Sequence, residues 1–383
     1  MLNDLNTSRS IIGKSFFNRY IRLIKHIDYA LLFLVLGLCV LGLLVIYSST
    51  HQENVANGTI QFVKKQVISI LAGLLVCLLI TIIDYHEITK LSIPGYVLSL
   101  IMLVYVIYYG KEIGGARRWI QLAGQEFQPA EFAKITLIIF LSDLLNKQKN
   151  KLPDLLYFSL PFLFTGILMF LSYKQPDLGT ALVFFAITLL MVFIAGIPWK
   201  YISIGFVLTL SLFPILWSLL RDYQRSRLIL FLNPEMDPLG AGYNVIQSKV
   251  AIGSGGLFGK GLFGGIQSQL KFLPSQHTDF VFAVIGEELG FVGALLLLSF
   301  FALLLWKGIK IAQEAPDLLG TFLATGITSF LFVQILINIG MSMGLMPATG
   351  LPLPFISYGG TFMISNFIGI GLLLNIHLRS IFN

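Results

Sequence analysis

The residues best suited to acid–base chemistry lie where His277-Thr278-Asp279 runs into a long apolar segment. Nearby cations and helix amides would keep a carboxylate at this point ionised, while partial burial would raise its pKa. That environment suits a general base. Thr278 or Asp279 could equally be the N-cap of the following helix, and the residues alone leave both interpretations open.

A second charged motif is Gln128-Pro129-Ala130-Glu131-Phe132-Ala133-Lys134. Pro129 suits a first helical position, and Lys134 shares a helix face with Glu131 because they are three residues apart. The pair could line a polar cavity. It could also be a local ion pair that lets a charged helix enter lipid.

Two further motifs carry carboxylates. In Gln175-Pro176-Asp177-Leu178-Gly179-Thr180 we expect a turn with Asp177 capping the next helix. Glu287 is expected roughly 12 Å below Asp279 along one helix, deep in the bilayer. Either Glu287 or Glu288 should be paired or protonated there, in a structural or a catalytic role.

Other chemistry is excluded by spacing. The glycine-rich run 253–261 superficially resembles a phosphate loop but lacks the required Lys-Ser/Thr spacing and follows no strand. No His and Cys cluster with metal-ligand spacing is present, and Cys39 and Cys77 lie inside apolar runs as small buried hydrophobes. We expect no nucleic-acid partner.

The elements that must position these residues are transmembrane helices. Of the 383 residues, 56% are hydrophobic and only 12% are charged, about half the charged fraction of a soluble domain. Runs long enough to cross a bilayer give about ten spans. They lie near 30–48, 66–83, 90–109, 130–146, 156–173, 178–196, 200–220, 280–305, 318–340 and 359–377. Because backbone in lipid must satisfy its own hydrogen bonds, the predicted fold is an all-α, polytopic integral membrane protein.

The predicted organisation is a basic tail, 1–28, followed by one transmembrane domain, 29–383. With an even number of spans, the tail and the basic loops 146–155 and 306–316 fall on one side, the cytoplasm, together with both termini. The long loop 221–279 lies on the other side, with short helices expected on the bilayer surface. The basic, aromatic segment 114–127 is expected to be a similar interface-seeking stretch.

Cations gather on the extracytoplasmic side, where topology does not require them. They include Arg117, Arg118, Arg221, Arg225, Arg227 and Lys249. An anionic extracytoplasmic ligand would explain them, and so would the phosphates of the outer leaflet.

Taken together, five motifs in order resemble the SEDS family (shape, elongation, division and sporulation). They are 114–120, 128–134, 175–180, the run from His277 to Gly290, and 354–360. Residues 233–249 and 350–355 resemble the RodA branch more than the division paralogue FtsW. Lys271, Ser275 and Gln276 depart from the usual pattern and make the surroundings of Asp279 more positive.

The resemblance implies a peptidoglycan glycosyltransferase acting in cell elongation, with Asp279 as the catalytic residue. Its substrate would be lipid II, and undecaprenyl pyrophosphate would be the leaving group. The implied substrate-binding residues are Arg117, Arg118, Glu131, Lys134, Arg221, Arg225, Lys249 and His277. A divalent cation such as Mg²⁺ or Mn²⁺ is a further candidate for stabilising the leaving group.

The resemblance also implies the setting. The protein would lie in the bacterial inner membrane with its active site facing the periplasm, among membrane lipids and the elongation machinery. Its partner would be a class B penicillin-binding protein, a transpeptidase with one membrane helix. Two other functions stay open, a lipid II flippase and a scaffold that only anchors the partner enzyme.

Overall fold

The computed structural model describes residues 26–51, 60–113, 116–122, 125–149, 154–220, 222–238, 242–270 and 272–382. Most of the predicted basic tail lies outside the described residues. So do Gly114, Gly115 and Lys271, and so does Arg221, a predicted substrate-binding residue.

Each of the ten predicted spans coincides with a helix. These are α2 (Tyr29–Ser49), α4 (Gln61–Ile82), α6 (Ser92–Tyr109), α7 (Pro129–Gln148), α8 (Asp154–Lys174), α9 (Leu178–Ile194), α10 (Trp199–Leu219), α14 (Val281–Gln313), α15 (Leu318–Ser342) and α16 (Gly360–Phe382). Within the described chain, seven of them are both long and apolar enough to cross a membrane, while α9 is shorter. The chain is a multi-pass membrane protein, as predicted.

Several helices begin at a capping aspartate. The Asp28 side chain accepts a hydrogen bond from the Leu31 amide at the start of α2, and Asp317 does the same for Gly320 at the start of α15. Asp177 caps α9 through the amide of Thr180, at 3.2 Å, so the predicted N-cap is confirmed.

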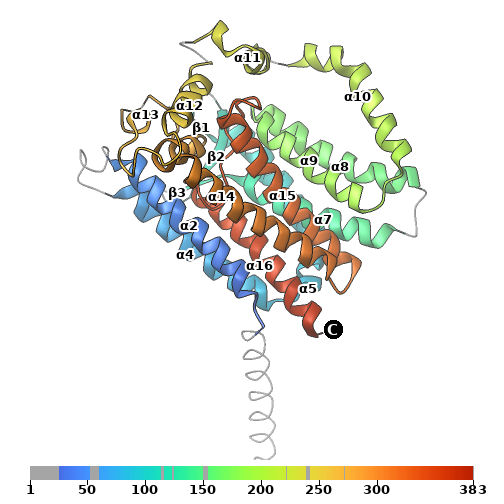
Figure 1. Cartoon of the computed structure of the whole chain (residues 1–383). Coiled ribbons are helices and arrows are strands. Elements are labelled where there is room, and N and C mark those ends of the chain that lie inside the picture. Colours follow the sequence, from blue (N-terminus) through green and yellow to red (C-terminus); the bar gives the residue numbers. More distant parts are fainter. Residues whose placement is uncertain are drawn as a thin grey trace, which may run out of the picture.

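The helices form one bundle with α15 and α16 at its centre (Figure 1). These two are the most buried of the seven long apolar helices. Helix α16 packs along α4, and α15 packs against α7, α9 and α14. Helix α10 is drawn at the outer edge of the molecule (Figure 1).

Ion pairs tie together one end of the bundle, where α2 starts and α16 finishes (Figure 1). Lys307 of α14 lies 2.7 Å from Asp28, and Arg379 of α16 lies 3.0 Å from Asp84. The start of the first span and residues 306–316 therefore share one end, in agreement with the predicted topology, although residues 306–313 form the last turns of α14 and not a loop.

The opposite end carries the long 221–279 segment, and its described residues form short helices, as predicted. They are α11 (Asp222–Leu232), α12 (Tyr243–Ser254) and α13 (Ile266–Gln269), with a 3-10 turn η1 (Pro234–Met236). One further short helix, α5 (Tyr85–Lys90), joins α4 to α6 at the other end.

The segment 114–127 differs from the prediction. Residues 116–122 and 125–127 belong to a small antiparallel sheet of β1 (Lys111–Ile113), β2 (Ala116–Leu122) and β3 (Gln125–Phe127), in the order β1-β2-β3. Lys111 on β1 forms an ion pair with Glu126 on β3 at 2.9 Å. Cross-strand pairing gives this short basic stretch the backbone partners that an isolated turn of helix would lack.

Candidate active site

Asp279 lies in a turn that leads into α14 at the end of the bundle carrying the long segment. Its backbone N–H donates to the carbonyl of Ser275 at 3.0 Å, and its carbonyl accepts from the side-chain amide of Asn338 at 2.8 Å. On either side, Ser357 donates to the carbonyl of Thr278, and the Tyr358 N–H donates to the carbonyl of His277. The turn is therefore fixed by α15 and by the segment before α16.

Asp279 does not cap the helix that follows it. The N-cap of α14 is Phe280, with no side-chain capping bond, and the Thr278 hydroxyl donates to the Ser275 carbonyl instead. The N-cap interpretation of Thr278 and Asp279 is therefore wrong.

Asp279 is half-buried. It lies beside Gly350, a glycine with φ +71°, where a Cβ would approach Oδ2 to 3.2 Å. Desolvation raises the pKa of Asp279, and the charges of Arg227 and Arg118 oppose that rise. Asp279 is therefore more basic than an ordinary aspartate, and the positive charges of Arg118 and Arg227 act on it.

Both arginines are held by backbone carbonyls. Arg118 of β2 donates to the carbonyls of Gln175 and Pro176, and its Nη1 lies 3.7 Å from Asp177. Arg227 of α11 donates to the carbonyl of Ala348 at 3.1 Å. These hydrogen bonds orient both guanidinium groups, and Asp177 balances part of the charge of Arg118.

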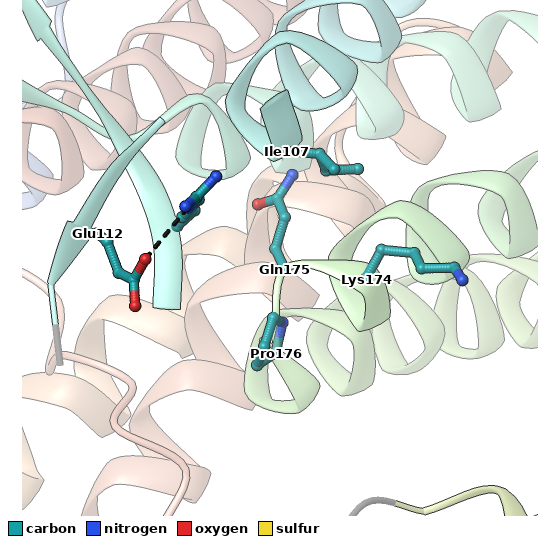
Figure 2. A pocket seen from close by; sticks show the side chains of 6 residues that line it. Ile107, Glu112, Lys174, Gln175 and Pro176 are labelled. Atoms are coloured by element: carbon teal, nitrogen blue, oxygen red, sulfur yellow. Dashed lines mark hydrogen bonds and ion pairs between the residues drawn. The ribbon is translucent and has the colours of Figure 1, made fainter. Parts of the chain in front are cut away.

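The neighbouring Arg117 pairs with Glu112 and not with the carbonyls that hold Arg118. Its Nε lies 3.2 Å from Glu112, and both side chains are exposed. Together with Ile107, Lys174, Gln175 and Pro176 they line a cavity of about 170 Å³ beside the sheet (Figure 2). Figure 2 shows Lys174 directed away from Glu112.

The other predicted cations of the long segment are spread out. Arg225 donates to the carbonyls of Trp217 and Ser218 at the end of α10, which is a helix-capping arrangement. Lys249 is exposed on α12 and lies against Gly344. The ring of His277 packs against Phe62 and Tyr358.

Glu131 and Lys134 form an ion pair of 2.8 Å inside the bundle, and the two side chains are 2% and 0% exposed. The ammonium group lies over the rings of Phe330 and Phe362, at 5.6 and 6.0 Å from their centroids. In this arrangement a substrate would reach the pair only if the helices around it moved.

Two residues that the sequence interpretation passed over belong to this site. Arg227 stood among the cations of the long segment but was not selected as a site residue. Asn338 is a fully buried amide in an apolar span, and a polar side chain at that depth is itself a signal of function.

The donor set around Asp279 does not fit a protein-held divalent cation. Such a cation prefers several oxygen ligands, whereas Asp279 faces two guanidinium groups. Among the described residues, no three His, Cys, Asp or Glu side chains come together as a metal site. We therefore derive no catalytic step through a metal.

The chain matches known proteins over nearly its whole length. The model of the FtsW, RodA and SpoVE family, described as cell cycle protein, matches residues 29–381. "Peptidoglycan glycosyltransferase MrdB" of Escherichia coli is 40% identical over 353 residues, covering 92% of this chain and 94% of the relative. "Probable peptidoglycan glycosyltransferase FtsW" of Trichlorobacter lovleyi is 39% identical over 355 residues, covering 91% and 92%.

Solved structures agree with this fold. A chain from a study of the structural coordination of polymerization and crosslinking by a peptidoglycan synthase complex superposes with a TM-score of 0.80. It is 33% identical, and the match covers 92% of this chain and 98% of that one. The rod shape determining protein RodA of Thermus thermophilus gives a TM-score of 0.68 at 32% identity, covering 92% and 96%. The resemblance seen in the sequence is confirmed, and this chain belongs to the FtsW, RodA and SpoVE family of cell cycle proteins.

Proposed function

We propose that this protein is a peptidoglycan glycosyltransferase that polymerises lipid II, with Asp279 as its general base. The observation that carries the proposal is the half-buried Asp279, held in its turn by Asn338, with the positive charges of Arg118 and Arg227 acting on its carboxyl group. Relatives named as peptidoglycan glycosyltransferases support the same class of reaction.

The reaction needs one base and one stabilised leaving group. The Asp279 carboxylate takes the proton of the acceptor GlcNAc 4-hydroxyl, and that oxygen attacks the anomeric carbon of the donor MurNAc. A new glycosidic bond forms as the bond from the anomeric carbon to the lipid pyrophosphate breaks. The bonding electrons leave with undecaprenyl pyrophosphate, and the proton stays on Asp279 until solvent removes it.

The charge on the pyrophosphate grows as that bond breaks. Arg118 and Arg227, oriented in advance by backbone carbonyls, would stabilise it without reorganising during the reaction. We assign a supporting role in holding the lipid-linked pyrophosphate to Arg117 and Lys249, whose side chains are exposed.

The setting follows from the same proposal. The site would face the periplasm from the inner membrane, with both termini in the cytoplasm. The partner would be a class B penicillin-binding protein, because the complex that contains a similar chain is described as coordinating polymerization and crosslinking. We assign the chain to cell elongation, on the residues 233–249 and 350–355 that resemble the RodA branch.

The test uses the purified full-length protein, fluorescent lipid II and gel separation of glycan strands. We expect polymer from wild type, none from Asp279→Asn, and normal polymer from the control Glu235→Gln, an exposed acid on the same segment. Flipping of lipid II in vesicles without polymer would indicate a transporter. Normal cell growth supported by Asp279→Asn would indicate a scaffold. Either result would overturn the proposal.

A further inference from the structure

Helix α14 is broken close to the proposed base. Gly290 has φ 67° and ψ −163°, values outside the helical region. Residues 281–289 therefore form a separate half-helix, joined to Asp279 through its N-cap Phe280, and residues 291–313 form the long remainder. The orientation of the half-helix is not set by continuity with the rest of α14.

The glycine-rich run 255–261 supplies hydrogen-bond partners for the backbone groups at this break. The amides of Lys260 and Gly261 donate to the carbonyls of Glu287 and Glu288, each at 3.0 Å. Past the break, the amides of Phe291 and Val292 donate to carbonyls at 256 and 257, at 2.9 and 3.1 Å. Unpaired backbone groups within a bilayer cost several kcal/mol each. The run 255–261 and the broken helix therefore supply each other with backbone hydrogen-bond partners.

The glycines let the two backbones approach. A Cβ on Gly255 would collide with the carbonyl oxygen of Gly286, and one on Gly259 would collide with that of Glu288. The run that superficially resembles a phosphate loop thus serves to pack against a broken helix.

Glu287 adds a charged connection to this backbone pairing. Its carboxylate is fully buried and lies 3.0 Å from the ammonium group of Lys260. It also accepts the amide N–H groups of Gln267 and Ser268, at 2.9 and 3.0 Å, at the start of α13. One side chain of the half-helix therefore fastens it to two separate parts of the 255–270 segment.

A buried ion pair contributes little net stability compared with apolar packing, because desolvation of the charges offsets their attraction. Its directional bonds do fix an orientation. Glu287 lies two helical turns beyond Asp279 on a half-helix that the break at Gly290 uncouples from the rest of α14.

We propose that Glu287 is a positioning residue for the reaction. Through Lys260 and the amides at 267 and 268, it holds the 281–289 half-helix, and with it Asp279, in the orientation used in catalysis. This inference rests on the proposed function and assigns Glu287 no contact with the reacting atoms.

The first test is kinetic, with full-length protein and fluorescent lipid II. Glu287→Gln and Lys260→Met should each lower kcat about tenfold with little change in KM, since small misplacements of a catalytic group cost that much or more. Lys260→Arg keeps the pair and should retain activity. The control is Glu314→Gln, which removes an exposed pair with Lys310 at the far end of α14. Wild-type kcat in both Glu287→Gln and Lys260→Met would overturn the inference.

The second test is hydrogen exchange, which does not depend on activity. In Glu287→Gln the amides of 256–261 and 281–289 should exchange faster together, while those of α15 stay unchanged. Faster exchange throughout the chain would indicate a purely structural role and would overturn the inference; Lys260→Met serves if Glu287→Gln does not fold. If wild type makes no polymer, the proposed function fails, and the exchange data alone decide whether Glu287 holds the half-helix.

Discussion

The side-chain amide of Asn338 lies 2.8 Å from the backbone carbonyl oxygen of Asp279 and 2.7 Å from that of Leu351. One buried side chain of α15 thus joins the turn before α14 to the segment before α16. Asn338 thus holds the backbone of the proposed base, Asp279, and leaves its carboxyl group available to the acceptor hydroxyl of the substrate.

Replacing Asn338 by Ala should weaken both fold and activity. Two carbonyls would lose their donor, and each unsatisfied buried group costs about 1–3 kcal/mol. We expect a lower unfolding temperature and a lower kcat in the lipid II assay. Asn233→Ala, at an exposed position, is the control. Unchanged kcat in folded Asn338→Ala protein would contradict the positioning role of this amide.

The arginines should set the acid limb of the pH profile. Because the base must be deprotonated, kcat/KM should fall at acid pH with an apparent pKa above the ordinary 3.8 of aspartate. Arg118→Gln or Arg227→Gln removes a charge that lowers the pKa of Asp279, so the limb should move to higher pH. Arg225→Gln should leave it in place. If the acid limb of the pH profile does not move in Arg118→Gln or Arg227→Gln, these charges do not act on Asp279.

The raised pKa of Asp279 also predicts a cost in stability. The folded state binds this proton more tightly than the unfolded state, so the free energy of unfolding falls as pH rises from the unfolded pKa through the folded one. Asp279→Asn should therefore unfold at a higher temperature than wild type at neutral pH. The difference in unfolding temperature should vanish below about pH 4, which is near the ordinary pKa of aspartate. A less stable variant at neutral pH would refute the raised pKa.

The ion pair of Glu131 and Lys134 should behave as a buried unit. Lys134→Met leaves an unpaired carboxylate in the bundle and should destabilise the protein by about 3–5 kcal/mol. The double variant Lys134→Met with Glu131→Gln should recover much of that loss in thermal unfolding. If the two substitutions instead destabilise the protein additively, Glu131 and Lys134 do not neutralise each other.

Much of this protein could be predicted from its sequence. Long apolar runs cannot be hidden in water, so ten helices and their approximate limits followed from composition alone. The predicted cap at Asp177 lies next to the helix it starts. The motif around Asp279 was also recognisable, because its residue types are adjacent in the chain.

Contacts between segments could not be predicted in this way. Pairing of 116–122 with 111–113 on one side and 125–127 on the other turned an expected interface-seeking stretch into a sheet. Only the folded chain places Arg118 and Arg227, from β2 and α11, around Asp279, and only it fits the glycines of 255–261 into the break at Gly290. Local periodicity reports which residues prefer lipid or helix, whereas these arrangements depend on which surfaces meet once the helices have packed.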